Sequence, residues 1–136
     1  MIQEEKELLI KDLCCRIPYN CIVSIAEGGI NGIVWADLTL TSYWFHQIME
    51  EDAWEYVKPY LRPISSMSEE EYQEFNNIRI EHTLKCLELD SEESFKLGLY
   101  FQQEEISNYL YQRHFDICDL ISKGLALEAP EGMYNN

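Results

Sequence analysis

The chain has 136 residues and carries 25 Asp and Glu residues against 10 Lys and Arg residues, so its formal net charge at pH 7 is −15. This length predicts one domain, which is large enough to bury a single hydrophobic core. The acidity argues against direct nucleic-acid binding and against docking on an anionic membrane, because both need clustered lysines and arginines.

The N-terminal residues and the cysteines predict a cytoplasmic protein. The first ten residues are acidic and lack the apolar core of a secretory signal, and no apolar run approaches the roughly 18 residues that span a membrane. The 5 cysteines are odd in number and include no C-x-x-C pair, which argues against a disulfide framework and a common zinc site. We therefore expect reduced cysteines, no metal and no cofactor.

The first third of the chain predicts a helix and a β-hairpin. Apolar residues recur at fourfold spacing over 3–15, which predicts an amphipathic helix that ends before Pro18. A β-rich run then leads to Asn31-Gly32, a pair typical of a type I′ turn, and an alternating run follows it. These features predict a hairpin over about 20–41.

A third strand is predicted directly after an aromatic segment. Trp54–Lys58 has strand-like composition, and Pro59 and Pro63 would confine such a strand to a sheet edge or close it, because proline cannot donate a hydrogen bond.

The second half of the chain predicts further helices. Ser68 and Glu71 have the spacing of a capping box, which starts a helix at 69 that runs to about 88. Over 94–101 the apolar residues stand at twofold spacing, which favours a strand, although the choice between strand and helix stays open at this point. From about 102 the pattern is helical again.

A last short helix is predicted over 117–123. Asp116 would cap its start, and Gly124 stands where a left-handed residue is wanted after its end. The fold class is therefore α+β, with a small antiparallel sheet (the hairpin plus one or two further strands) packed with an N-terminal helix and C-terminal helices. We expect one domain over 1–129 and a frayed tail over 130–136.

Three sequence patterns invite a catalytic or ligand-binding interpretation. Gly28-Gly29-x-x-Gly32 lies between two β-like runs rather than before a helix, so a hairpin turn explains it better than a phosphate loop does. His114 and Cys118 stand four residues apart, as two metal ligands or a nucleophile pair could, but two ligands are too few for a structural zinc site. Paired carboxylates are too numerous to identify an acid–base pair. We assign no catalytic, cofactor-binding or metal-binding residue from the sequence.

Aromatic side chains gather between positions 35 and 60, a segment that holds all 3 tryptophans. These rings would either fill the core or form an exposed binding patch, since Trp and Tyr are enriched at binding hot spots. Stacking on single-stranded bases would also need a basic groove, which the segment lacks. The candidate interaction patch consists of Trp35, Trp44, Trp54, Tyr56 and Tyr60.

Two sequence blocks carry a family resemblance. The first is Lys58-Pro-Tyr-Leu-Arg-Pro63 followed by Ser65-Ser-Met-Ser-Glu-Glu-Glu71. The second is Tyr109-Leu-Tyr-Gln-Arg-His-Phe-Asp116 followed by Leu120-Ile-Ser-Lys-Gly-Leu-Ala-Leu-Glu-Ala-Pro-Glu-Gly-Met-Tyr134. Together they resemble an uncharacterised family of small proteins encoded by gut anaerobes and their prophages or mobile elements. The resemblance implies a phage or mobile-element accessory protein but no particular chemistry.

One position departs from the family pattern. Asp116-Ile-Cys-Asp-Leu120 stands where that group usually carries Asp-Tyr-Arg-Gly-Leu, which argues against a shared ligand contact there. We also expect Arg62 to pair with an acidic group such as Asp116.

The sequence thus favours a non-enzymatic domain that acts through a protein partner. In one form of this hypothesis, the acidic surface mimics DNA and occupies the basic groove of a DNA-handling protein. The alternative is a small hydrolase that uses His114 or Cys118 with a carboxylate, and a third class is a homo-oligomeric structural protein. Over Glu69–Glu105, 11 acidic residues face 3 basic ones, so more than half of the net charge lies in that segment.

Overall fold

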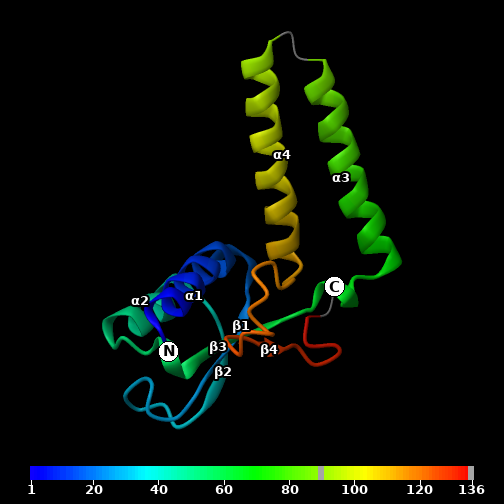
Figure 1. The fold of residues 1–136 in the computed structure, drawn as a ribbon. Coiled ribbons are helices and arrows are strands. Elements are labelled where there is room, and N and C mark those ends of the chain that lie inside the picture. The colour runs from blue at the N-terminus through cyan, green and yellow to red at the C-terminus, as the bar shows by residue number, and fades with distance from the viewer. Residues whose placement is uncertain (89–90, 135–136) are drawn as a thin grey trace.

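The computed structural model describes residues 1–88 and 91–134 and shows an α+β fold (Figure 1). The described residues form four α-helices and a four-stranded mixed sheet with the order β2-β1-β3-β4. The predicted fold class is confirmed.

The predicted N-terminal helix is present as α1 (Gln3–Arg16). Glu4 and Glu5 lie in its first turn and Arg16 in its last turn, which complements the helix dipole. A short 3₁₀ turn that contains Pro18 follows. Because proline disfavours the helical conformation of the preceding residue, the chain leaves the α-helix at this point.

The predicted hairpin is also present. β1 (Ile22–Ile25) pairs antiparallel with β2 (Ala36–Thr39). The expected type I′ turn is wrong, because a loop of several residues joins the strands and, of Asn31 and Gly32, only Gly32 has a positive φ, of 87°. The pair still forms a tight turn, in which the Ile33 N–H donates to the Ile30 carbonyl over 3.0 Å.

The third strand, β3 (Val57–Leu61), begins three residues later than predicted and lies inside the sheet, between β1 and β4. The expectation that prolines confine it to an edge is wrong. The Ala26 N–H donates to the Tyr56 carbonyl over 2.8 Å. From Tyr56 onward, every second residue therefore points its backbone N–H and C=O groups toward β1. Pro59, opposite Val23, is one of the residues in between, so it needs no N–H group to pair with β1.

The sheet is mixed and not purely antiparallel as the sequence predicts, because β4 (Leu127–Glu128) pairs parallel with β3. The tail was expected to fray after Pro130, but its described part is held to the sheet. The Tyr134 hydroxyl donates to the Tyr60 carbonyl over 2.7 Å and accepts from the Ile22 N–H over 2.8 Å. Residues 135–136 of the predicted tail lie outside the described part of the chain.

Helix α2 (Ser42–Glu50) follows β2 and was not predicted. The Thr41 hydroxyl caps it by accepting from the Trp44 N–H over 3.3 Å. Its aromatic composition hides it, because Tyr, Trp and Phe are common in strands and have only moderate helix propensity.

Two long helices follow β3. α3 (Glu69–Leu87) starts with the predicted capping box: the Glu71 N–H donates to the Ser68 hydroxyl, and the Ser68 N–H donates to the Glu71 carboxylate, each over 3.1 Å. α4 (Glu92–Gln112) occupies the segment for which twofold spacing favoured a strand over 94–101, so that prediction is wrong. A repeat with an apolar residue at every second position also places apolar residues four positions apart, and residues four apart lie on the same face of a helix.

The predicted last helix over 117–123 is replaced by turns. Its expected cap is nevertheless present, since the Asp116 carboxylate accepts from the N–H groups of Leu120 (2.8 Å) and Ile121 (3.0 Å). Gly124 is left-handed as predicted, with a φ of 74°. A cap stabilises the first turn, but too few residues follow it here to propagate a helix.

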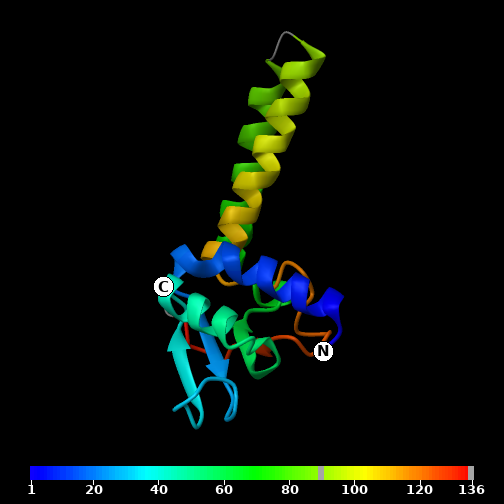
Figure 2. The same cartoon turned by 90° about the vertical axis from the view of Figure 1, so that its left-hand side faces the viewer.

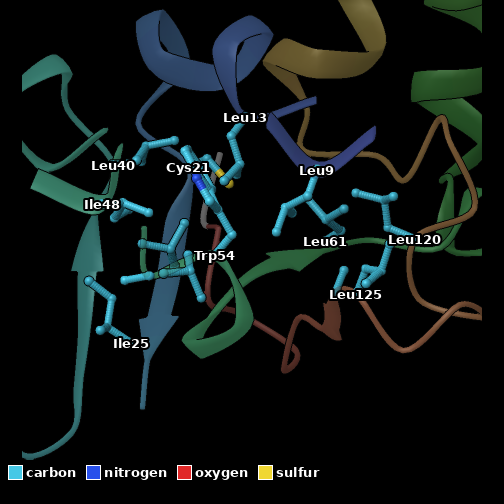
Figure 3. Close-up of a cluster of buried hydrophobic side chains, with 14 of the residues drawn as sticks. Leu9, Leu13, Cys21, Ile25, Leu40, Ile48, Trp54, Leu61, Leu120 and Leu125 are labelled. Carbon is cyan, nitrogen blue, oxygen red and sulfur yellow. The ribbon is translucent and has the colours of Figure 1, made fainter. Parts of the chain in front are cut away.

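The hydrophobic core lies between the sheet and helices α1 and α2, and the turns after α4 close its far end (Figure 3). Its buried side chains come from all these elements and include Leu9, Leu13, Cys21, Ile25, Leu40, Ile48, Trp54, Leu61, Leu120 and Leu125.

One ion pair is fully buried beside this core. The Arg16 Nε donates to Asp12 Oδ2 over 2.6 Å, and Arg16 Nη2 donates to the Phe115 carbonyl over 2.8 Å. The guanidinium also lies over the Tyr111 ring, 4.8 Å from its centroid. Arg16 therefore joins α1 to the end of α4 and to the chain that follows it.

Asp12→Ala should lower the free energy of unfolding by about 3–5 kcal/mol, because it leaves the buried Arg16 guanidinium without its counter-ion. Chemical denaturation checks this, with Glu7→Ala on the exposed side of α1 as the matched control. A loss below 1 kcal/mol in Asp12→Ala would show that the pair does not hold the two segments together.

Candidate functional site

Helices α3 and α4 project together from the rest of the molecule (Figures 1 and 2). We call residues 69–87 and 92–112 the helical arm. At 1.5 Å per residue, each helix is roughly 30 Å long. Among the side chains of the arm that the structure describes, only those of Glu71 and Tyr109 are buried, and both lie near its base. The described side chains of the arm are therefore mostly exposed or half-buried.

Arg62 anchors the base of the arm at the end of β3. Its guanidinium donates to both oxygens of Glu71, over 2.8 and 2.6 Å, and lies over the Phe115 ring at 4.3 Å from the centroid. The hydrogen bonds from Arg62 lower the pKa of Glu71 to about 2. The predicted ion pair between the side chains of Arg62 and Asp116 is wrong. The Asp116 carboxylate instead accepts hydrogen bonds from the N–H groups that it caps.

Tyr109 and Arg113 of α4 and the segment after it form a second connection at the base. The Tyr109 hydroxyl donates to the Glu71 carbonyl over 3.1 Å and to the Glu74 carboxylate over 2.9 Å. Arg113 pairs with the same carboxylate over 3.0 Å. Burial and the bond to Glu74 raise the pKa of Tyr109 to about 12, so the phenol remains a hydrogen-bond donor at neutral pH. These contacts hold α3 and α4 together where they leave the body.

Further along the arm, α3 uses one side to meet α4. Phe75 lies against Tyr109, with ring centroids 6.3 Å apart, and His82 pairs with Glu105. Phe75 and His82 are seven residues apart, which places them on one side of the helix.

The other side of α3 exposes apolar residues. Tyr72, Ile80 and Leu84 are 52%, 47% and 58% exposed. At 100° per residue, Ile80 and Leu84 point away from the side of α3 that meets α4. Tyr72 lies between these two sides of the helix. We call these three residues the α3 stripe. Single exposed apolar residues are ordinary, but three that follow one row along a helix make a candidate binding surface.

The five residues of the predicted aromatic patch differ in their exposure. Trp54 is buried in the core and packs edge-on against Phe45 with centroids 5.4 Å apart, and Trp44 is half-buried. Tyr60 is half-buried and donates to Asp37. Trp35 and Tyr56 are the exposed members.

Tyr56 packs against the loop between β1 and β2. A Cβ added to Gly29 would lie 2.5 Å from the Tyr56 Cβ, so only glycine allows this approach. The glycine-rich stretch is thus part of a loop between two strands, as predicted, and its close contact is with an aromatic side chain.

His114 and Cys118 lie in environments that weaken a catalytic role. The His114 ring is buried and stacks on Tyr134 with centroids 3.7 Å apart, and its Nδ1 has no hydrogen-bond partner among the described residues. Burial, with Arg16 and Arg62 nearby, lowers the pKa of His114 to about 4. Burial raises the pKa of the Cys118 thiol, which disfavours the thiolate that a nucleophile needs.

A cavity of about 560 Å³ lies at the base of the arm. It is lined by Arg62, Glu71 and Tyr134 together with residues of the C-terminal segment, and neither His114 nor Cys118 lines it. Its charged lining consists of the Arg62–Glu71 pair together with Glu128 and Glu131. Within residues 1–88 and 91–134, no group of three or more His, Cys, Asp or Glu side chains is placed to hold a metal ion.

Comparisons of the chain with protein-family models, with curated proteins and with solved structures gave no match. In the part of the chain that the structure describes, no helix combines the length and apolar character needed to cross a bilayer. The fold itself defines the class, which is an α+β domain that carries a projecting pair of antiparallel helices.

Glu71→Gln should destabilise the protein by about 2 kcal/mol, since it removes a charge-assisted pair of hydrogen bonds to Arg62. The folded-state pKa of Glu71, about 2, lies below its ordinary value of 4.5, so its contribution is complete above pH 4.5 and is lost as the pH falls toward 2. Unfolding free energies of wild type and Glu71→Gln should therefore converge in acid. Parallel curves down to pH 2 would contradict the assignment, and Glu70→Gln is the matched control.

His114 should add an acid sensitivity at higher pH. Its folded-state pKa of about 4 lies below the ordinary 6.5, so the unfolded chain takes up the proton first and stability falls as the pH drops from 6.5 to 4. His114→Asn tolerates the positive φ of 67° at this position and has no titratable ring. Its unfolding free energy should vary less with pH across this window than that of the wild type. An equal slope in both proteins would show that His114 does not titrate as a buried base.

Proposed function

We propose that this protein is a non-enzymatic accessory protein that acts by binding another protein, and that the α3 stripe is the contact surface. The observation that carries the proposal is the projecting arm, whose stripe is exposed while the body has a separate, well-packed core. Two helices alone bury little apolar surface, and most helical stability in proteins comes from packing of an amphipathic face. A partner that covers the stripe would supply the missing packing.

The resemblance of the two sequence blocks supports a phage or mobile-element context for this activity. Both blocks also lie at the base of the arm: the first contains Arg62 and Glu71, and the second contains Tyr109, Phe115 and Tyr134. The residues that carry the resemblance are therefore those that position the arm. This is consistent with a family in which the placement of the helices matters.

Mimicry of DNA by the acidic surface is a special case of this proposal. Over Glu69–Glu105 the excess of acidic over basic residues is 11 − 3 = 8, so this segment could occupy a basic groove. Binding by carboxylates alone would weaken steeply with salt, whereas binding through the α3 stripe would retain a salt-independent part. Capture of the partner at low and high salt therefore distinguishes the two forms.

The decisive experiment compares three forms of the full-length protein as bait in a lysate of the host cell. In the arm variant, Ile80 and Leu84 are both changed to Gln. In the control variant, Met49 and Ile64, which are 51% and 48% exposed on other elements, are changed to Gln. Glutamine is a good helix former, so neither variant should unfold, and circular dichroism checks this.

We expect a protein that the wild type and the control variant capture equally and that the arm variant captures at least tenfold less, because two central apolar contacts contribute about 1 kcal/mol or more each. Equal capture by all three forms would overturn the proposal. Loss in Trp35→Ala but not in the arm variant would move the contact to the loop between β1 and β2. Concentration-dependent light scattering that the arm variant abolishes would make the partner a second copy of this chain.

A further inference from the structure

Strand β2 forms one edge of the sheet, since the strand order is β2-β1-β3-β4. The Leu40 N–H donates to the Cys21 carbonyl over 2.7 Å, so residues 36, 38 and 40 point their backbone groups toward β1. The backbone groups of Asp37 and Thr39 therefore point away from the sheet. In the described part of the chain no strand lies beyond β2, and both residues are exposed. This edge is available to pair with another strand.

The edge lacks most of the features by which proteins block strand pairing. β2 contains no proline, and its residue pairs with β1 follow one another without interruption. Its one charged residue is Asp37. That carboxylate accepts from the Tyr60 hydroxyl of β3 over 3.1 Å, which draws it across its own sheet and away from the edge.

We infer that this edge pairs with the same edge of a second copy of the chain. In an antiparallel pair, the residues that exchange backbone hydrogen bonds are those whose N–H and C=O groups point outward. A two-fold axis at Leu38 meets this condition, because Asp37 of each copy then lies opposite Thr39 of the other. Each of these two pairs exchanges two backbone hydrogen bonds, and the two sheets become one continuous sheet.

The side chains favour this register over the neighbouring ones. The two Leu38 side chains meet at a non-hydrogen-bonded pair, where side chains lie closest, on the face that packs against the core. On the other face, each Asp37 carboxylate can accept from the Thr39 hydroxyl of the other copy. An axis at Asp37 would instead place two carboxylates opposite each other. An axis at Ala36 would extend the pairing into the loop before β2.

The ends of the strand add to the contact. With the axis at Leu38, Trp35 of each copy lies opposite Thr41 of the other, directly before the start of α2. Trp35 and Tyr43, the second residue of α2, are 59% and 61% exposed, so both rings have surface left to bury. The paired segment is still short, and such small interfaces form weak complexes.

The charge of the chain opposes association less at this edge than at the arm. Residues 20–41 hold two of the 25 acidic residues, Glu27 and Asp37. The hairpin and the arm lie at opposite ends of the molecule (Figures 1 and 2). Antiparallel pairing also reverses the direction of the second copy, so the two acidic arms stay far apart compared with the screening length of about 10 Å. A second copy supplies the matching side chains by symmetry.

The test changes Thr39 in the full-length protein to Asp or to Lys. The Thr39 side chain is exposed, so both variants should fold, which circular dichroism checks. In the proposed dimer, the new side chain lies opposite Asp37 of the other copy. Asn108→Asp and Asn108→Lys, at an exposed position of α4, are the matched controls for the change in net charge. Analytical ultracentrifugation measures self-association from about 10 µM to about 1 mM, the range of weak interfaces.

We expect the wild type to form dimers as its concentration rises. Thr39→Asp should weaken the dimer about tenfold and Thr39→Lys should strengthen it about threefold, because two cross-strand pairs change in each dimer. The Asn108 variants should change it less than about twofold, since their charges are exposed and distant. A monomer at every concentration would overturn the inference. So would a dimer that the Thr39 variants change no more than the Asn108 variants do.

Amide hydrogen exchange provides a second readout at the edge itself. The Asp37 and Thr39 N–H groups should exchange more slowly at the highest concentration than at the lowest, because pairing protects them. Unchanged exchange would overturn the inference. Protection that appears only when a lysate of the host cell is added would overturn it as well, and would show that the edge binds a strand of another protein.

This inference goes beyond the proposed function and fails separately from it. The arm variant, with Ile80→Gln and Leu84→Gln, should form the dimer as the wild type does, because its changes lie on α3 and not on β2. Loss of the dimer in that variant would overturn the inference and assign self-association to the α3 stripe.

Discussion

Arg62 leaves the end of β3 and places its guanidinium between the first turn of α3 and the Phe115 ring. Its own backbone takes part as well: the Arg62 N–H donates to the His114 carbonyl over 2.8 Å, and the Asp116 N–H donates to the Arg62 carbonyl over 2.9 Å. One residue thus fixes where the arm begins and where it returns to the body. This residue therefore helps to set the direction in which the arm projects, together with Arg16 of α1, which lies over the Tyr111 ring of α4.

A second arginine supports the same segment from the opposite side. Arg16 donates to the Phe115 carbonyl, so Phe115 is bound by α1 through its backbone and by Arg62 through its ring. The Tyr134 ring then covers His114 and ties the C-terminal segment to β1 and β3. The backbone groups of residues 114–116 are thus bound by Arg62 and Arg16, which are distant in the sequence. The same contacts leave His114 buried and neutral, which makes it part of the packing of the domain.

Local signals in the sequence predicted the elements whose boundaries depend on local chemistry. The capping box of Ser68 and Glu71, the proline after α1 and the left-handed Gly124 all act within a few residues, and the structure contains each of them. The wrong predictions concern residues whose structure depends on contacts with residues distant in the sequence. Pro59 lies inside the sheet because β4 pairs only with the next residues of β3, and Arg62 pairs with Glu71 because Asp116 is already used as a cap. Of the arm, the sequence predicts α3 and the later part of α4, and it fails over 94–101, where a twofold repeat of apolar residues favours a strand but also fits fourfold spacing.

The projection of the arm gives the uneven charge of the chain a structural interpretation. The acidic segment is the projecting one, so mutual repulsion of carboxylates acts on the part of the molecule whose described side chains are mostly exposed or half-buried. A stripe of Tyr72, Ile80 and Leu84 on a neutral helix would favour association with any apolar surface, including its own copy. Under the proposed function, the acidic charge of the arm would disfavour partners of like charge, because like-charged surfaces are repelled before their apolar groups can meet.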